Sequence, residues 1–154
     1  MGIQRLSHIG ICVSRIERSL RFYRDGLGFR ELSQLEVSGA SAARLLEIEG
    51  VRLHAVYLER DGTRIELLAY THPGHRGPSE ARPMNALGLS HLSLRVEDLD
   101  ATLAAVEAAG GRVLAATRTD NPAFRTSAVF VTDPDGTRIE LLQAPGDPSA
   151  LPGA

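Results

Sequence analysis

Residues 61–68 read Asp-Gly-Thr-Arg-Ile-Glu-Leu-Leu, and residues 135–142 read the same eight letters. A second repeat pairs Leu-Ser-His-Ile at 6–9 with Leu-Ser-His-Leu at 89–92. An eight-residue identity is very improbable by chance within 154 residues, and self-similarity along a chain is typical of a duplicated structural unit. The repeats therefore predict two copies of one module, of which the first is the longer between its two signatures.

Hydrophobic periodicity predicts the same order of elements in each half, namely a strand, a helix and three strands. In the first half we expect an opening strand at 6–13 and, after the helix, strands near 30–36, 43–49, 51–59 and 63–70. The segment 43–59 could equally form one strand with a kink at Gly50.

The second half repeats this order. An opening strand is expected at 89–96, and Asp98 is the expected N-cap of the following helix. Strands are then predicted near 112–117, 126–132 and 137–143.

These elements predict an α+β fold in which two tandem βαβββ modules form a curved, mostly antiparallel sheet around a cup. Module one spans about 5–70, a linker rich in Pro, Gly, His and Arg spans 71–88, and module two spans about 89–143, so that the domain covers 1–144. Residues 145–154 are rich in Pro, Gly and Ala and are expected to form a disordered tail.

The composition excludes several functions. All 17 basic residues are arginines, which rules out a Schiff-base lysine and the lysine of a phosphate-binding loop. The single cysteine permits neither an internal disulfide nor a thiolate zinc site. A formal net charge of -2 and an aromatic content of 5% argue against a nucleic-acid partner, and no apolar run reaches the ~18 residues that span a bilayer. We therefore expect a cytoplasmic protein whose partner is a small molecule.

Side-chain alternation places one histidine and one glutamate of each half on the same face of its sheet. In each opening strand, alternate apolar residues form one face, which leaves His8 and His91 on the other. Within the repeated octapeptide, the apolar neighbours of the glutamate face the core. Glu66 and Glu140 therefore point the other way, toward the face that carries the histidines.

Two imidazoles and two carboxylates at matching positions favour a metal site. A buried carboxylate between apolar residues is costly unless it is paired or bound to a cation, and one divalent ion would satisfy both carboxylates. The donor set suits Zn, Ni, Co, Mn or Fe, with coordination positions left for water or substrate. The alternative is that the histidines are ordinary core residues and that the glutamates pair with Arg64, Arg138 or Arg95.

Four further residues are candidates for contact with a substrate. Cys12 and Arg95 share the face of the two histidines. Cys12 could instead be a small core residue, and Arg95 could hold a substrate carboxylate in a bidentate manner or pair with a structural acid. Phe124 and Arg125 lie in the loop before the last hairpin, where they could border a pocket or simply face solvent.

Taken together, these motifs resemble the vicinal-oxygen-chelate superfamily, also called the glyoxalase/bleomycin-resistance/dioxygenase family. The resemblance covers roughly residues 5–143. It is carried by Ser-His-Ile-Gly-Ile-Cys-Val at 7–13, Arg-Phe-Tyr-Arg-Asp-Gly-Leu-Gly-Phe at 21–29, Arg-Ile-Glu-Leu-Leu at 64–68, Leu-Ser-His-Leu-Ser-Leu-Arg-Val-Glu-Asp-Leu-Asp at 89–100 and Asp-Pro-Asp-Gly-Thr-Arg-Ile-Glu-Leu-Leu at 133–142.

The resemblance implies that one divalent metal takes its ligands from the first and last strand of each module, which are here His8, Glu66, His91 and Glu140. Such a set is similar to those of glyoxalase I and the methylmalonyl-CoA epimerases, in which the metal chelates vicinal oxygens and stabilises an enediolate or enolate. The implied activity is that of a lyase or isomerase, with Glu140 as catalytic base and Glu66 as its counterpart on the other face. The family also implies paired modules, often in a homodimer.

Two alternative functions stay open. A non-haem iron ring-cleaving or other dioxygenase would use two histidines and one glutamate, and a metal-free antibiotic-binding resistance protein would use none of the four residues. Segment 118–125 differs from the glycine-rich, basic segment that serves glutathione in bacterial glyoxalase I, and segment 71–84 differs from the long helical connection of the epimerases. The expected substrate is therefore a small oxygen-rich metabolite.

Overall fold

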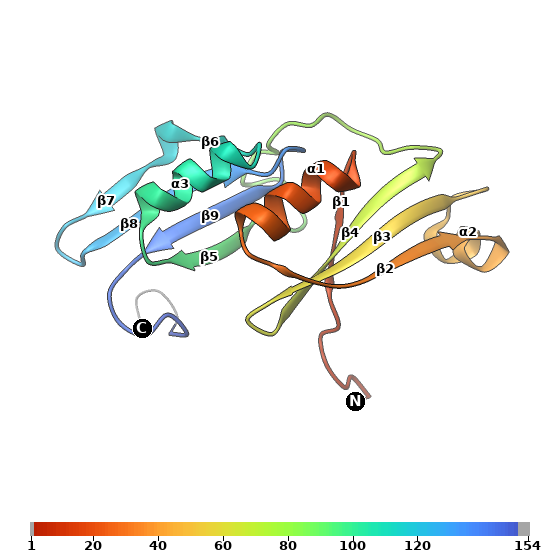
Figure 1. Cartoon of the computed structure of the whole chain (residues 1–154), viewed down its shortest axis with the longest axis horizontal. Coiled ribbons are helices and arrows are strands. Elements are labelled where there is room, and N and C mark those ends of the chain that lie inside the picture. Colours follow the sequence, from red (N-terminus) through yellow and green to blue (C-terminus); the bar gives the residue numbers. More distant parts are fainter. Residues whose placement is uncertain (1, 151–154) are drawn as a thin grey trace. The chain divides into compact units, whose positions relative to one another are not determined.

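The structure, a computed structural model of the chain, describes residues 2–150. The chain divides into two compact units, with the boundary between Gly77 and Pro78. Each unit contains one β-sheet with a helix packed against it (Figure 1). The predicted α+β class and the duplicated βαβββ pattern are confirmed, and the strands are arranged as two sheets, one in each unit.

The first unit has a four-stranded sheet in the order β1-β4-β3-β2. Its strands are β1 (Ile9–Cys12), β2 (Arg30–Ser38), β3 (Arg52–Arg60) and β4 (Thr63–His72). β1 runs parallel to β4, whereas β3 pairs antiparallel with both β2 and β4. Since β1 and β2 lie at opposite edges of the sheet, the chain between them has to cross one of its faces.

This crossing is a helix that buries one face of the first sheet. α1 (Ile16–Leu20) continues as a π-helix, η1 (Arg21–Gly26), and α1 contacts β4. Ile65 and Leu67 on β4 are fully buried, as side-chain alternation requires for the face beneath a helix. The opposite face of β4 is therefore the one that carries Glu66.

The prediction of a strand at 43–49 is wrong, because this segment lies largely in a second helix, α2 (Ala40–Leu46). Alanine, leucine and arginine are strong helix formers, and Gly39 supplies the positive φ of 91° at the helix start. Ala42, Ala43 and Leu46 have helical spacing and pack against a cluster built around Leu53. The segment therefore follows a period of 3.6 residues instead of a period of two.

The second unit repeats the architecture with a sheet in the order β5-β9-β8-β6 and with β7 paired to β8. β5 runs parallel to β9, and the other pairs are antiparallel. The strand expected at 112–117 is shorter than predicted, because residues 115–117 form a 3-10 helix, η2 (Ala115–Thr117). The strands are β5 (Leu92–Val96), β6 (Arg112–Val113), β7 (Thr119–Asn121), β8 (Thr126–Thr132) and β9 (Arg138–Gln143).

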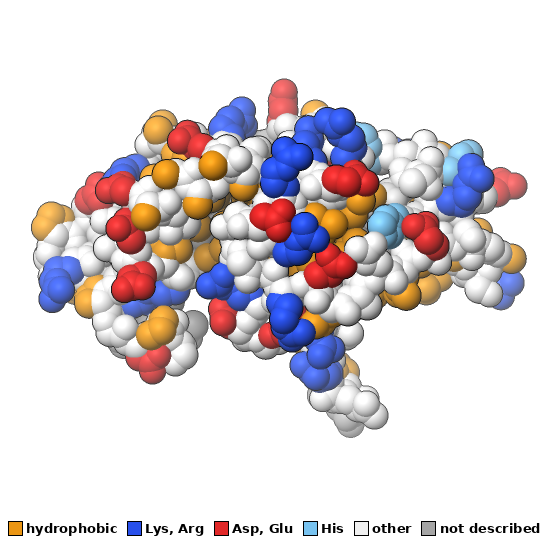
Figure 2. Space-filling view, viewed as in Figure 1, with side chains coloured by type: hydrophobic (Ala, Val, Ile, Leu, Met, Phe, Trp, Pro, Cys, Tyr) orange, Lys and Arg blue, Asp and Glu red, His pale blue; other side chains and the backbone are white. Residues whose placement is uncertain are grey.

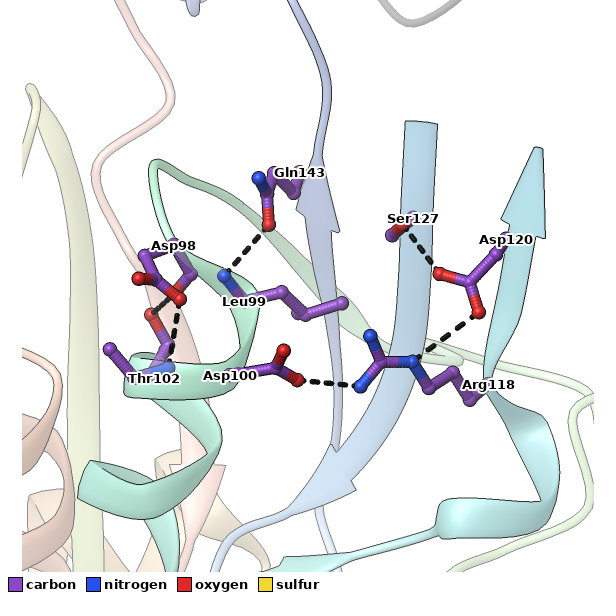
Figure 3. Close-up of polar contacts among 9 residues, drawn as sticks. Asp98, Leu99, Asp100, Thr102, Arg118, Asp120, Ser127 and Gln143 are labelled. Carbon is purple, nitrogen blue, oxygen red and sulfur yellow. Dashed lines mark hydrogen bonds and ion pairs between the residues drawn. The ribbon is translucent and has the colours of Figure 1, made fainter. Parts of the chain in front are cut away.

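Helix α3 (Leu99–Ala108) contacts β8 and β9 in this unit, and its first turn is fixed by side chains (Figures 1 and 3). The predicted N-cap is confirmed, since Asp98 Oδ1 accepts a hydrogen bond of 2.9 Å from the backbone N–H of Ala101. The N–H of Leu99 donates to Gln143 Oε1 at 2.9 Å. These bonds satisfy two of the N–H groups that a helix start leaves without intrahelical partners, and the second ties α3 to β9.

Two segments outside the sheets were also predicted. Residues 73–91, which include most of the expected linker, contain neither helix nor strand. Of the expected tail, 151–154 lie outside the described residues, and Arg95 donates hydrogen bonds to the carbonyl oxygens of Ala144 and Pro145 at its start. Among residues 2–150, no helix is long and apolar enough to cross a membrane.

Removal of the Asp98 cap should destabilise the second unit. We expect Asp98→Ala to lower the free energy of unfolding by about 1 kcal/mol, because the N–H of Ala101 loses its acceptor at a helix start. Asp98→Asn is the matched control, since its amide oxygen can still accept this bond. Urea unfolding monitored by circular dichroism measures the difference, and equal stability of the two variants would show that the cap contributes nothing.

Candidate functional site

In the first unit, His8 and Glu66 form a close pair on the sheet face opposite α1. His8 directly precedes β1, and the parallel register sets Gly10 of β1 beside Glu66 of β4. His8 Nε2 lies 3.1 Å from Glu66 Oε2, and the two side chains are 33% and 15% exposed. The carboxylate is thus partly withdrawn from water and paired, as its position between apolar residues requires.

Two neighbours orient this pair. Ser7 Oγ lies 3.1 Å from His8 Nδ1, the ring nitrogen that does not face Glu66. Tyr57 of β3 is the register partner of Glu66, and its ring packs edge-on against the imidazole at 5.2 Å. The Tyr57 hydroxyl donates a hydrogen bond to Glu66, and this bond, together with burial and the carboxylate charge, raises the pKa of Tyr57 to about 12.

The second unit builds a similar arrangement around His91 and Glu140. Ser90 Oγ lies 2.9 Å from His91 Nδ1. The imidazole packs edge-on against Phe130 at 5.3 Å, and Phe130 is the β8 register partner of Glu140. On the other side of the carboxylate, Ser93 of β5 donates a hydrogen bond of 2.7 Å to Glu140 Oε2.

Each unit therefore presents one imidazole and one carboxylate beside an aromatic ring, with a serine on the imidazole Nδ1. We call each set a half-site. A divalent ion of the transition series needs about four or more ligands, so a half-site alone is an incomplete metal site. Accordingly, within residues 2–150 no three His, Cys, Asp or Glu side chains are grouped so as to hold a metal. The convergence of all four residues on one ion stays a prediction.

Two of the three arginines that could pair with the glutamates, Arg138 and Arg95, have other partners. Arg138 donates from Nε to the carbonyl oxygen of Arg82 at 2.8 Å and stacks over the ring of Phe130 at 5.8 Å. Arg95 donates to two backbone carbonyls near the end of β9. Its guanidinium is thus already engaged by main-chain oxygens. Charged side chains of both signs are interspersed over the face shown in Figure 2.

The other proposed substrate contacts lie at different places in the fold. Cys12 is exposed at the end of β1, in the strand that follows His8. Phe124 is 71% exposed, and Arg125 follows it at a positive φ of 53° in the turn between β7 and β8. These roles stay predictions.

Sequence reasoning missed five residues of the half-sites. The signal for two of them was visible, because a serine precedes the histidine in both copies of the first repeat. The other three face the carboxylates from neighbouring strands, and only the strand register identifies them. The five are Ser7, Ser90, Tyr57, Ser93 and Phe130.

The model of the Glyoxalase/Bleomycin resistance protein/Dioxygenase superfamily matches residues 5–141. The chain belongs to this superfamily. The match includes both half-sites, and it confirms the family resemblance inferred from the motifs.

Among relatives in the superfamily, the lactoylglutathione lyase of Haemophilus influenzae is 31% identical over 150 residues, covering 96% of this chain and 98% of the relative. The uncharacterized protein YaeR of Escherichia coli is 31% identical over 143 residues, covering 93% of this chain and 98% of YaeR. The crystal structure of a glyoxalase family protein from Bacillus cereus superposes with a TM-score of 0.81 at 19% identity and covers 95% of this chain and 97% of its own. This last similarity supports the fold.

The Tyr57–Glu66 contact predicts a shift in a tyrosine titration. In chelator-treated protein, Glu66→Gln should lower the pKa of Tyr57 from about 12 toward 10.0, because the negative charge that disfavours tyrosinate is removed. One more tyrosine should then ionise between these two pH values. Ultraviolet absorbance of tyrosinate measures this directly.

The same shift has a consequence for stability. Because ionisation of Tyr57 is harder in the folded state, the contact adds stability that is present below pH 10 and is lost as the pH rises through about 12.

The control for the tyrosine titration is Tyr57→Phe in the Glu66→Gln background, since this variant should remove the additional ionisation. Identical titration curves for the wild type and Glu66→Gln would contradict the hydrogen bond.

Proposed function

We propose that this protein is a divalent-metal-dependent lyase or isomerase of the glyoxalase type, and that His8, Glu66, His91 and Glu140 hold the ion, within one chain or in a homodimer. The observation that carries the proposal is the duplicated half-site, in which an imidazole and a carboxylate lie on the sheet face opposite the crossing helix of each unit. Membership of the superfamily and the lactoylglutathione lyases among the relatives support the same activity.

The chemistry of the donors fits a metal such as Zn, Ni, Co, Mn or Fe. Two imidazole nitrogens and two carboxylates are a donor set that these ions accept, and the two negative charges would balance a divalent cation. Cysteine would be needed for a structural thiolate site, but the sequence contains only Cys12. The donor set thus favours a site that keeps positions open for substrate oxygens.

The serine hydroxyls are suited to hold the imidazoles for ligation. A histidine that binds a metal through Nε2 has to carry its proton on Nδ1, and that N–H needs an acceptor. Ser7 Oγ lies at 3.1 Å and Ser90 Oγ at 2.9 Å from the respective Nδ1 atoms. Because a hydroxyl can donate or accept, each serine can serve the free imidazole as well as the ligating one.

Glu140 is proposed as the base that moves the proton. When bound, a divalent ion would polarise a substrate carbonyl and so acidify the adjacent C–H bond. Glu140 would take this proton, leaving an enediolate- or enolate-like substrate, and return it to a neighbouring carbon; for an epimerisation, Glu66 would instead deliver a proton to the same carbon from the opposite face. Ser93, at 2.7 Å from Glu140 Oε2, would orient the carboxylate. Glu66 would be its counterpart on the other face of the substrate.

The proposed substrate is a small metabolite with two adjacent oxygens. Because two of the relatives are named lactoylglutathione lyases, the adduct of methylglyoxal and glutathione is the first compound to test. Cys12, Arg95, Phe124 and Arg125 are the side chains proposed to contact the substrate beyond its reacting carbons.

Metal binding tests the proposal without any knowledge of the substrate. Protein purified without chelators should bind one divalent ion per chain, because each half-site supplies only half of the ligands. His8→Ala and His91→Ala should each lower the affinity for this one ion by at least about tenfold, as expected when a ligand is lost. Elemental analysis and calorimetric titration measure stoichiometry and affinity, and His75→Ala, an exposed histidine outside both half-sites, is the control.

Other stoichiometries separate the alternatives. Two ions per chain, each lost with one histidine, would show that the half-sites act independently. No binding at millimolar supply would favour the metal-free binding protein, and turnover that needs oxygen and iron would favour the dioxygenase.

The base assignment predicts a second result. Glu140→Gln should retain a metal, more weakly, and should lose about 10²- to 10⁴-fold in proton transfer, the usual contribution of a positioned general base. The measurement is exchange of the substrate proton in deuterium oxide, followed by NMR with the methylglyoxal–glutathione adduct. Glu97→Gln, on the exposed surface after β5, should behave as the wild type. Full turnover by Glu140→Gln would refute the assignment.

A further inference from the structure

Each glutamate accepts a hydrogen bond from an uncharged hydroxyl. In one unit this hydroxyl comes from the strand on one side of the glutamate, and in the other unit it comes from the strand on the opposite side. In the first unit, the phenol of Tyr57 on β3 donates to Glu66, and the β1 neighbour is Gly10, which has no side chain to donate. In the second unit, the hydroxyl of Ser93 on β5 donates to Glu140, and the β8 neighbour is Phe130, which has no hydroxyl. The half-sites are therefore alike in their ligand residues but different in the groups around them.

The two donors also differ in rigidity. The ring of Tyr57 is half-buried and is fixed by its edge contact with His8 at 5.2 Å and 84°, so its hydroxyl has little freedom. Ser93 is exposed, and its hydroxyl turns about a single side-chain bond. Glu66 is thus held between a fixed phenol and an imidazole at 3.1 Å, whereas Glu140 is held by a small and mobile donor.

The position of Gly10 explains why the first unit takes its donor from β3. A Cβ atom at position 10 would lie 3.3 Å from Leu68 Cδ1, closer than carbon atoms ordinarily pack. Leu68 in turn packs against the cluster that α2 covers. A serine at position 10, equivalent to Ser93, would therefore require the terminal methyl of Leu68 to shift by a few tenths of an ångström.

We propose that Tyr57 is a positioning residue that fixes Glu66 as the permanent carboxylate ligand, and that the absence of this hydroxyl at Phe130 leaves Glu140 as the carboxylate that can leave the metal and move a proton. This inference rests on the proposed metal site and narrows it to the reaction in which Glu140 alone moves the proton, with Glu66 acting only as a ligand. Packing against the imidazole does not require the hydroxyl, because Phe130 makes the same edge contact with His91 at 5.3 Å and 90°.

The test exchanges the two aromatic residues. Tyr57→Phe, Phe130→Tyr and the double exchange are each loaded with cobalt(II), and the affinity for cobalt and its visible absorption spectrum are measured. Tyr57→Phe should weaken cobalt binding by about 10- to 100-fold, the usual effect of removing a hydrogen-bond partner from a metal ligand, and should change the spectrum because Glu66 is no longer fixed. Tyr70→Phe removes a hydroxyl from the same face of β4 and is the control, with no change expected.

Phe130→Tyr should have the opposite effect. A phenol that donates a hydrogen bond to Glu140 should keep or strengthen cobalt affinity. It should lower the rate of proton exchange on the methylglyoxal–glutathione adduct by about tenfold or more, because Glu140 is then less free to leave the metal and take the proton. The double exchange should bind cobalt more tightly than Tyr57→Phe and exchange protons more slowly than the wild type. Circular dichroism verifies that each variant is folded.

The outcomes are distinguishable. Wild-type affinity and spectrum in Tyr57→Phe would overturn the inference while leaving the metal site intact. Unchanged proton exchange in Phe130→Tyr would show that the hydroxyl does not decide which carboxylate acts as base, and this result also overturns it. Failure of the wild-type protein to bind cobalt would overturn the proposed function itself, and the inference with it.

Discussion

In each unit the first strand pairs in parallel with the last one, and this pairing brings the strand that follows the histidine alongside the strand that carries the glutamate. The register sets Gly10 against Glu66 and Ser93 against Glu140. A slip by one residue would turn each glutamate into the core, because side chains alternate between the two faces of a strand. The crossing helix maintains the register, since it covers only the face on which the apolar residues lie. Every contact in the half-sites depends on this arrangement.

The same arrangement decides how the charges are accommodated. Ile65 and Leu67, on either side of Glu66, are buried beneath the helix, so their burial stabilises the strand that carries the carboxylate. On the other face, Glu66 is 15% exposed and is paired with His8. Its desolvation is thus moderate and compensated by partners. In the second unit, Ile139 and Leu141 are buried in the same way around Glu140.

The sequence predicted the duplicated α+β architecture, because the repeats and the alternation of side chains can be recognised without tertiary contacts. Alternation assigned both histidines and both glutamates to the faces opposite the crossing helices, and residue type identified the cap at Asp98. Local signals were misleading at 43–49, where alanine and leucine favour α2 and where the strand pattern was weak. Tyr57 could not be recognised, because its role depends on the register between β3 and β4. The engagement of Arg95 by backbone carbonyls depends likewise on tertiary contacts that no spacing predicts.

The close approach of Leu68 to Gly10 links α2, the additional helix of the first unit, to the surroundings of Glu66. The same side chain therefore meets different surroundings in the two copies. A serine is accommodated at position 93, whereas at the matching position 10 its Cβ would meet Leu68 at 3.3 Å, beneath the cluster that α2 completes. In the structure the hydroxyl that Glu66 accepts comes from Tyr57 on β3, whereas position 10 on β1 has no side chain. The connection between β2 and β3, which forms α2, thus influences which side chains fit beside a carboxylate on another strand.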